Sequence, residues 1–394
     1  MDGYTTALVC AAAAAGAALV RSGKRYIDNS AVELLAAPDG VRAMIEAHCP
    51  SLVAPARARL VPPPYLPTGM LQTIYGAMVA LRRDSESDIE YDRQLRTMED
   101  GGTVSLDWFP ARPSGPECAQ PIAIVMSGLG GSAYEYHIRC LAKHLATKSR
   151  AGMRVAVLNY RGSGRTPLTS STMYNGYDTS DIYDTVGYLA QSFPRAPLVC
   201  VGFSMGANLL ARYLGETGDK SRIAACVTVS CPFSGETAGR AINAPGLLFD
   251  KFFQPALTGT IKRIVKRNQD IIQSGAITYD IDAIMRAKRV CDVDNALTAR
   301  AYGFKDCWEY YAACSSTDFI ERIRCPFLAI NALDDPIALP EGLPMDQIAK
   351  NPRAAIALVA HGGHIGFFSG LSARMWHLQP VLEFLDAVLA DKAE

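Results

Sequence analysis

Short apolar segments recur from about residue 120 onwards, and a longer amphipathic stretch separates each one from the next. These segments are apolar at every position instead of at alternate ones, which is typical of strands buried on both faces of a parallel sheet. The stretches between them have helical spacing, so the chain has the pattern of a βαβ series. We therefore predict a mostly parallel, doubly wound α/β sheet, with strands at Ile122–Ser127, Arg154–Asn159, Leu198–Phe203, Ile223–Ser230, Pro326–Asn331 and Ala355–Ala360.

The alternation breaks between about residues 233 and 317, where the sequence becomes helical and carries a basic run from Lys262 to Arg267. An insertion of this size after a sheet strand is expected to form a helical cap over the carboxyl edge of the sheet. Before the sheet, Ala31–Ala47 has the spacing of an amphipathic helix. Val61–Thr73 is rich in proline and is expected to be extended. Ile89–Trp108 has the pattern of a hairpin that turns at residues 100–102.

The N-terminus contains an uncharged, alanine-rich stretch from Tyr4 to Val20, followed at once by Arg21, Lys24 and Arg25. This stretch is at the short limit for a membrane span, and the basic residues follow the apolar run instead of preceding it as in a signal peptide. A targeting segment and a soluble helix remain alternatives. We favour a membrane anchor within residues 1–25, with residues 4–20 in the membrane and the rest of the chain on the cytoplasmic side.

Composition narrows the classes of function. The chain of 394 residues is 49% hydrophobic and has no formal net charge, so no nucleic-acid partner is indicated. Its 11 cysteines include no CxxC pair, which favours reduced, buried thiols. No cluster of potential ligands indicates a metal, and neither GxGxxG nor GxxxxGK[ST] follows a strand. We therefore expect no metal and no cofactor.

The strongest chemical signal is the sequence Gly202-Phe203-Ser204-Met205-Gly206, which ends a predicted strand and begins a predicted helix. In this setting the serine lies on a sharp turn that lifts its hydroxyl above the sheet. Serine is a poor nucleophile without a base. The expected order along the chain is serine, acid, histidine.

The candidates for the base and the acid follow Ser204 along the chain. His364 is favoured over His361, because the glycine pair between them carries His364 further from the preceding strand. Asp334 and Asp335 follow the strand that ends at Asn331, and one of them should accept the Nδ1 hydrogen of the histidine. We favour Asp334 and expect Asp335 to fix the turn or to cap the next helix.

Ester chemistry also needs donors for a developing oxyanion. The backbone N–H of Met205, directly after the serine, is one candidate. The other is Leu129, in the glycine-rich loop that follows the first parallel strand.

Several longer motifs carry a family resemblance: PYLPTGMLQT, SGLGGSAYEY, LNYRGSGRTPL, VGFSMGANLLARYLGE, WEYYAACSS, PFLAINALDDP and HGGHIGF. In this order they resemble the YheT-like, abhydrolase-domain branch of the α/β-hydrolases, which includes yeast medium-chain fatty acid ethyl ester synthases/esterases. The resemblance implies a triad of Ser204, Asp334 and His364. From the pattern of the whole chain we expect an N-terminal extension at residues 26–86 and an α/β-hydrolase domain at 87–394, with the cap at about 233–317. The family usually has histidine where this chain has Met70, and often where it has Ser127, which leaves substrate preference open.

These observations favour a serine esterase acting on lipid or medium-chain acyl esters, in the manner of a monoacylglycerol lipase. Acyl transfer to an alcohol is an alternative, because water and alcohol would attack the same acyl-enzyme. A third hypothesis is a non-catalytic binding protein on the same fold.

Overall fold

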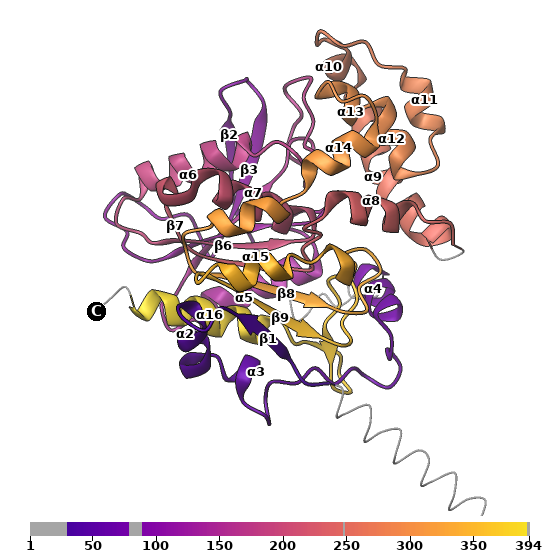
Figure 1. The fold of residues 1–394 in the computed structure, drawn as a ribbon. Coiled ribbons are helices and arrows are strands. Elements are labelled where there is room, and N and C mark those ends of the chain that lie inside the picture. The colour runs from indigo at the N-terminus through magenta and orange to yellow at the C-terminus, as the bar shows by residue number, and fades with distance from the viewer. Residues whose placement is uncertain (1–29, 79–88, 247–248, 392–394) are drawn as a thin grey trace, which may run out of the picture.

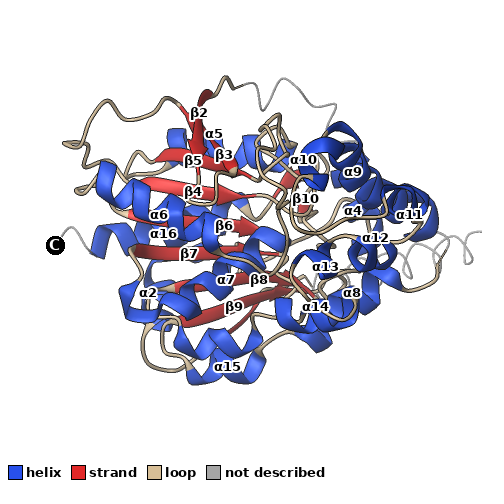
Figure 2. Cartoon of the chain, turned by 90° about the horizontal axis from the view of Figure 1, so that it is seen from above, coloured by secondary structure: helices blue, strands red, loops and turns tan. Residues whose placement is uncertain are grey.

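The computed structural model describes residues 30–78, 89–246 and 249–391. Within them, one sheet has the strand order β1-β9-β8-β7-β6-β4-β5-β3-β2 (Figures 1 and 2). Its central strands pair in parallel, which confirms the predicted fold class. They are β4 (Ile122–Met126), β5 (Arg154–Asn159), β6 (Leu198–Phe203), β7 (Ile223–Val229), β8 (Phe327–Ala332) and β9 (Ala354–Val359).

Helices cover both faces of the sheet, as the continuous burial of its central strands requires (Figure 1). One face packs against α6 (Ser180–Ser192), α7 (Met205–Thr217) and α15 (Met345–Lys350). The other packs against α2 (Val41–His48), α3 (Pro50–Val53), α5 (Tyr136–Lys148) and α16 (Leu378–Asp391). The short 3-10 helices are η2 (Gly218–Lys220), η4 (Thr317–Arg322) and η5 (Pro340–Gly342).

Antiparallel strands close both edges of the sheet. The predicted hairpin is confirmed as β2 (Asp92–Thr97) and β3 (Thr103–Phe109), whose turn places Gly101 at φ 79°. At the opposite edge, β1 (Glu33–Ala36) runs antiparallel to β9. The segment expected to be an N-terminal extension therefore contributes a strand to the same sheet.

Two local predictions for this N-terminal segment were wrong. A single helix over Ala31–Ala47 is replaced by β1 and α2, because the edge of β9 offers backbone hydrogen bonds and Gly40 breaks the helix at φ 102°. The segment expected to be extended up to Thr73 instead becomes helical at Gly69, where α4 (Gly69–Met78) begins two residues after the last proline.

A helical insertion lies between β7 and β8, at the end of the sheet where the parallel strands have their carboxyl termini (Figure 2). It contributes most of the residues of two small hydrophobic cores. Its elements are α8 (Gly235–Asn243), the π-helix η3 (Phe249–Phe253), α9 (Gln254–Arg267), α10 (Gln269–Gln273), α11 (Ile281–Arg286), α12 (Val290–Ala296), α13 (Thr298–Ala301) and α14 (Cys307–Cys314).

Among the residues that the structure describes, no helix is both long enough and apolar enough to cross a membrane. This finding corrects the prediction of a membrane-associated protein with a single N-terminal span and a cytoplasmic catalytic domain. The segment assigned to that span, residues 4–20, lies outside the described residues.

Candidate active site

Ser204 lies on a sharp turn between β6 and α7, as the sequence predicts. Its backbone has φ 51° and ψ −120°, a left-handed conformation that is rare for any residue other than glycine. The turn is held by hydrogen bonds on both sides: Ser204 N–H donates to the Val229 carbonyl at 3.0 Å, and Asn208 N–H donates to the Ser204 carbonyl at 3.1 Å. Backbone strain of this kind persists where the surroundings over-determine the conformation, and it is common at functional sites.

The two glycines of the motif allow neighbouring segments to approach closely. A Cβ atom on Gly202 would lie 2.7 Å from Ala207 Cα, and a Cβ on Gly206 would lie 2.5 Å from the Ser127 carbonyl oxygen. Neither space can accept a side chain. The motif is therefore required by the geometry of the turn and by its contact with the loop after β4.

Ser204, His364 and Asp335 form a continuous hydrogen-bonded chain. His364 Nε2 lies 2.7 Å from Ser204 Oγ, and His364 Nδ1 lies 2.9 Å from Asp335 Oδ2. The side chain of His364 is 8% exposed and that of Asp335 is fully buried. The backbone amides of Ile337 and Ala338 donate to Asp335 Oδ1 at 2.8 and 2.9 Å, so the buried carboxylate is well satisfied.

The structure places Asp334 elsewhere, which corrects the predicted pairing with His364. Asp334 Oδ1 accepts the backbone N–H groups of Gly362 and Gly363, each at 2.9 Å, and Asp334 Oδ2 lies 3.3 Å from His361 Nδ1. Consecutive side chains leave the end of a strand in different directions, so only one of the two carboxylates can face His364. Asp335 does fix the turn as expected, through the amides of Ile337 and Ala338, but it also orients His364.

The loop after β4 lies against Ser204. A Cβ atom on Gly128 would lie 3.1 Å from Ser204 Cβ, so the loop passes directly beside the nucleophile. Leu129 is the next residue in this loop, and Met205 begins α7 directly after Ser204. Both predicted oxyanion residues therefore belong to the two segments that meet at the Ser204 side chain.

Three side chains that the sequence analysis did not single out fasten this loop. Tyr160 Oη donates to the Ser127 carbonyl at 2.8 Å, Ser163 Oγ donates to the Gly131 carbonyl at 2.6 Å, and Asn159 Oδ1 accepts the Ala133 amide at 2.7 Å. All three come from the end of β5 and the loop after it, within the motif LNYRGSGRTPL. The sequence shows this motif, but it does not show that side chains of the motif bind the loop after β4.

Aromatic rings and histidines pack behind the serine turn. The ring of His137 lies 4.8 Å from that of Phe203, and the fully buried His377 lies 5.7 Å from the same ring. Burial, with a smaller contribution from neighbouring histidines, lowers the pKa of each histidine to about 3. These rings are therefore neutral near pH 7 and support the turn by packing.

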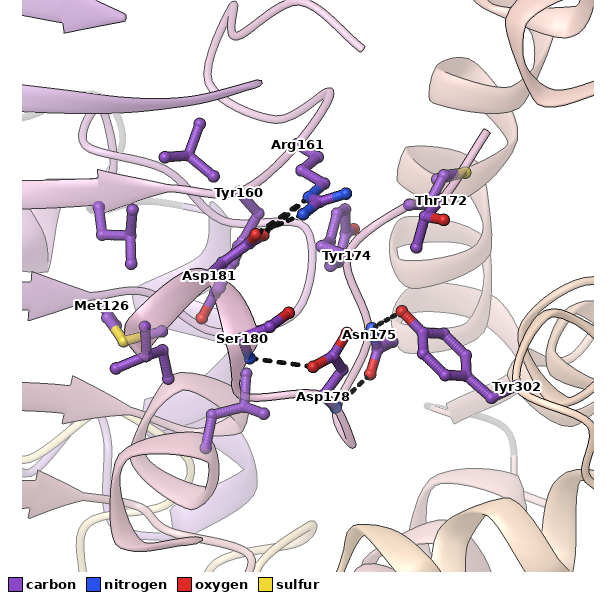
Figure 3. Close-up of a pocket in the computed structure, with 15 residues that line it drawn as sticks. Met126, Tyr160, Arg161, Thr172, Tyr174, Asn175, Asp178, Ser180, Asp181 and Tyr302 are labelled. Carbon is purple, nitrogen blue, oxygen red and sulfur yellow. Dashed lines mark hydrogen bonds and ion pairs between the residues drawn. The ribbon is translucent and has the colours of Figure 1, made fainter. Parts of the chain in front are cut away.

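A small hollow opens beside Leu129, between the loop and the helical insertion. Its lining combines apolar side chains and tyrosines with polar groups, and it includes Leu129, Met173, Ile261, Leu297, Ala301, Asn175 and the buried Asp294. Figure 3 shows the adjoining hollow, where Asn175 donates to Tyr302 of the insertion and Arg161 pairs with Asp181 on the opposite wall. Asn175 and Tyr302 line both hollows.

Comparisons with known proteins agree with this architecture. A family model described as the alpha/beta hydrolase fold matches residues 121–371. A monoacylglycerol lipase of Saccharomyces cerevisiae is 34% identical over 269 residues, which are 68% of this chain but only 59% of the lipase. The human phospholipase ABHD3 is 27% identical, covering 87% of this chain and 80% of its own length.

One further protein and one solved structure are similar to this chain. Medium-chain fatty acid ethyl ester synthase/esterase 2 of Saccharomyces cerevisiae is 28% identical, covering 86% of this chain and 87% of its own length. Among solved structures, an esterase of Pyrococcus furiosus superposes with a TM-score of 0.50 at 16% identity, over 77% of this chain and 92% of the esterase. By its sheet, its serine turn and these similarities, the chain belongs to the α/β-hydrolase family, in the abhydrolase-domain branch.

Proposed function

We propose that this protein is a serine carboxylic-ester hydrolase acting on lipid or medium-chain acyl esters. The observation that carries the proposal is the hydrogen-bonded chain from Ser204 Oγ through His364 to the buried Asp335. A nucleophile, a base and a group that orients the base are the three parts that acyl transfer by serine requires.

The reaction follows from these three roles. Ser204 Oγ attacks the ester carbonyl carbon while His364 Nε2 takes the hydroxyl proton. The tetrahedral intermediate collapses, the carbon–oxygen bond to the alcohol breaks, and His364 returns the proton to the leaving alcohol. Water then attacks the acyl-enzyme, with His364 again acting as base, and releases the acid. Asp335 keeps the Nδ1 hydrogen of His364 in place and stabilises the imidazolium that forms in each half-reaction.

The negative oxygen of each tetrahedral intermediate needs fixed donors. We assign the backbone N–H groups of Met205 and Leu129, because their segments meet at Ser204. Gly128 has no side chain to separate the loop from the serine. Tyr160 and Ser163 hold the loop carbonyls on either side of Leu129, so its amide is held in place before substrate arrives.

The hollow beside Leu129 is the proposed site of the acyl chain. It is partly apolar and lies between the oxyanion loop and the insertion. Relatives named as a monoacylglycerol lipase and a phospholipase favour esters with an acyl chain of this kind. The phenylalanine-rich segment 246–253 of the insertion would also suit an acyl chain, but it lies partly outside the described residues.

Acyl transfer to an alcohol is the second candidate, favoured by the similarity to an ethyl ester synthase/esterase. An alcohol in place of water would attack the same acyl-enzyme and give a new ester. The ratio of acid to ethyl ester formed in mixtures of water and ethanol separates the two activities. Formation of acid alone at every ethanol concentration would exclude the second candidate.

The proposed function is tested by hydrolysis of p-nitrophenyl esters from acetate to palmitate. The wild type, Ser204→Ala and a control, Ser221→Ala, are compared after circular dichroism has established that all are folded. We expect turnover by the wild type and the control, with a maximum at one chain length, and none by Ser204→Ala. Equal turnover by Ser204→Ala would contradict the proposal. So would the absence of turnover on every ester, which would favour a binding role instead.

A further inference from the structure

The first turn of α4 lies against the loop that carries His364, although 291 positions separate Thr73 from His364. The Thr73 hydroxyl donates to the Gly69 carbonyl at 2.7 Å and accepts the backbone N–H of His364 at 2.8 Å. A hydroxyl has only one proton to donate. Because Gly69 takes that proton, the hydroxyl lone pairs are left to face His364.

The first turn of α4 packs between the loop after β8, which carries Asp335, and the loop after β9, which carries His364. A Cβ atom on Gly69 would lie 2.1 Å from the Asp334 carbonyl oxygen, and a Cβ on Gly363 would lie 2.1 Å from the Gly69 carbonyl oxygen. No side chain fits at either contact. Gly69 and Gly363, which have no side chains, therefore allow α4 to reach the backbone of both loops at once.

The histidine loop has a conformation that needs support from outside. Ile365 has φ 61°, a left-handed conformation that costs a residue with a Cβ atom roughly 1–2 kcal/mol and is especially unusual for a β-branched side chain. Its amide donates to Ser230 Oγ at 2.9 Å. The consecutive amides of His364 and Ile365 are thus each held by a hydroxyl, one from α4 and one from the end of β7.

We propose that Thr73 is a positioning residue that holds the backbone of His364, so that Nε2 stays within hydrogen-bond distance of Ser204 Oγ. The inference rests on the proposed function and gives a role to the motif PYLPTGMLQT, which lies before the segment that the family model matches. Thr73 contacts no reacting atom. Its effect passes through the His364 amide alone.

The test compares three substitutions in the full chain, with p-nitrophenyl butyrate as substrate. Thr73→Val removes the acceptor with little change in volume, and Thr73→Ser keeps it. Thr217→Val is the matched control. Thr217 is 6% exposed and Thr73 is 5% exposed. The Thr217 hydroxyl also donates to a carbonyl four residues earlier, that of Tyr213 at 2.7 Å, but within the described part of the chain it accepts no amide from another segment.

We expect Thr73→Val to lower kcat roughly 10- to 100-fold with KM changed by less than about twofold, because a small displacement of a catalytic group slows the chemical step. Thr73→Ser should keep kcat within about threefold of the wild type, since it restores the acceptor. Thr217→Val should lower the thermal unfolding midpoint as much as Thr73→Val does and leave kcat unchanged. If Thr73→Val does not fold, Thr73→Ala replaces it with the same expected result.

The results distinguish a wrong role for Thr73 from a wrong proposed function. If the wild type hydrolyses the ester, Ser204→Ala does not, and Thr73→Val has the kcat of Thr217→Val, then the role of Thr73 is overturned and the proposed function stands. A rise in KM without a fall in kcat, or a Thr73→Ser variant as slow as Thr73→Val, would also overturn it. If the wild type is no more active than Ser204→Ala, the proposed function fails first.

Discussion

Asp335 Oδ2 lies 2.9 Å from His364 Nδ1, and the carboxylate of the adjacent Asp334 instead accepts two glycine amides from the loop before His364. The two aspartates thus divide two tasks. Asp335 orients the imidazole, and Asp334 shapes the loop that carries it.

Replacing each aspartate in turn with asparagine tests the two roles separately. Asp335→Asn should lower kcat by roughly 10⁴, because an amide in this position favours the wrong tautomer of His364. Asp334→Asn should lower it by less than about tenfold, since the amide oxygen can still accept the N–H groups of Gly362 and Gly363. Steady-state hydrolysis of p-nitrophenyl butyrate by the two folded variants decides. The reverse order of effects would restore Asp334 as the triad acid.

Tyr160 provides a test of the loop that we assign to the oxyanion. Tyr160→Phe keeps the ring stacked on Tyr174 but removes the hydrogen bond to the Ser127 carbonyl. We expect kcat to fall by roughly tenfold at nearly constant KM, because the loop donor is less well fixed in the transition state. Tyr65→Phe is the control, since Tyr65 Oη also donates to a carbonyl, that of Leu371, at the surface. Equal kcat values for the two variants would argue against this role of the loop.

The hollow beside Leu129 should set the preferred acyl chain length. Ala301 lines this hollow, and Ala301→Phe would fill part of it. The maximum of kcat/KM across the p-nitrophenyl ester series should move to shorter chains, and turnover of the acetate should stay within about twofold of the wild type. Ala301→Ser keeps the size of the side chain and should not move the maximum. An unchanged maximum in Ala301→Phe would place the acyl chain elsewhere.

The free energy of unfolding should depend on pH because of the buried His377. This side chain is fully buried against Phe203 and Phe367, and burial lowers its pKa to about 3. The ordinary pKa of histidine is about 6.5, so between that pH and about pH 3 the unfolded chain binds more protons than the folded one. The free energy of unfolding should therefore fall as the pH drops below about 6.5, and should not change on this account at higher pH.

The variant His377→Leu measures this contribution. It should reduce the loss of unfolding free energy between pH 8 and pH 5 by about 2 kcal/mol. His48→Leu, which changes an exposed histidine, should leave the loss unchanged. Urea denaturation at both pH values gives the comparison. A loss that is the same in His377→Leu and the wild type would show that His377 is not the group responsible.

The central sheet could be predicted from the sequence because its signals are local. The fully apolar segments reappear as strands, and the serine turn follows β6 as expected. The wrong predictions concern segments whose secondary structure depends on contacts with residues far away in the sequence. Ala31–Ala47 has helical spacing, but the edge of β9 draws residues 33–36 into the sheet.

The same difference between local and distant contacts explains which residues of the candidate site could be predicted from the sequence. Ser204 and His364 were predicted by motif and order along the chain, whereas the choice between Asp334 and Asp335 depends on which way each carboxylate points after β8. The roles of Thr73 and Tyr160 depend on contacts with segments far away in the sequence, with the His364 loop and with Ser127. No local pattern contains that information.

The most direct test of the central claim is to identify the residue that a fluorophosphonate ester labels. The intact mass of the wild type should rise by one phosphonyl group, and fragmentation should place that group on Ser204. Asp335→Asn should react far more slowly, and Ser204→Ala should not react. A folded wild type that gains no mass, or an adduct on a residue other than Ser204, would contradict the assignment of Ser204 as the nucleophile.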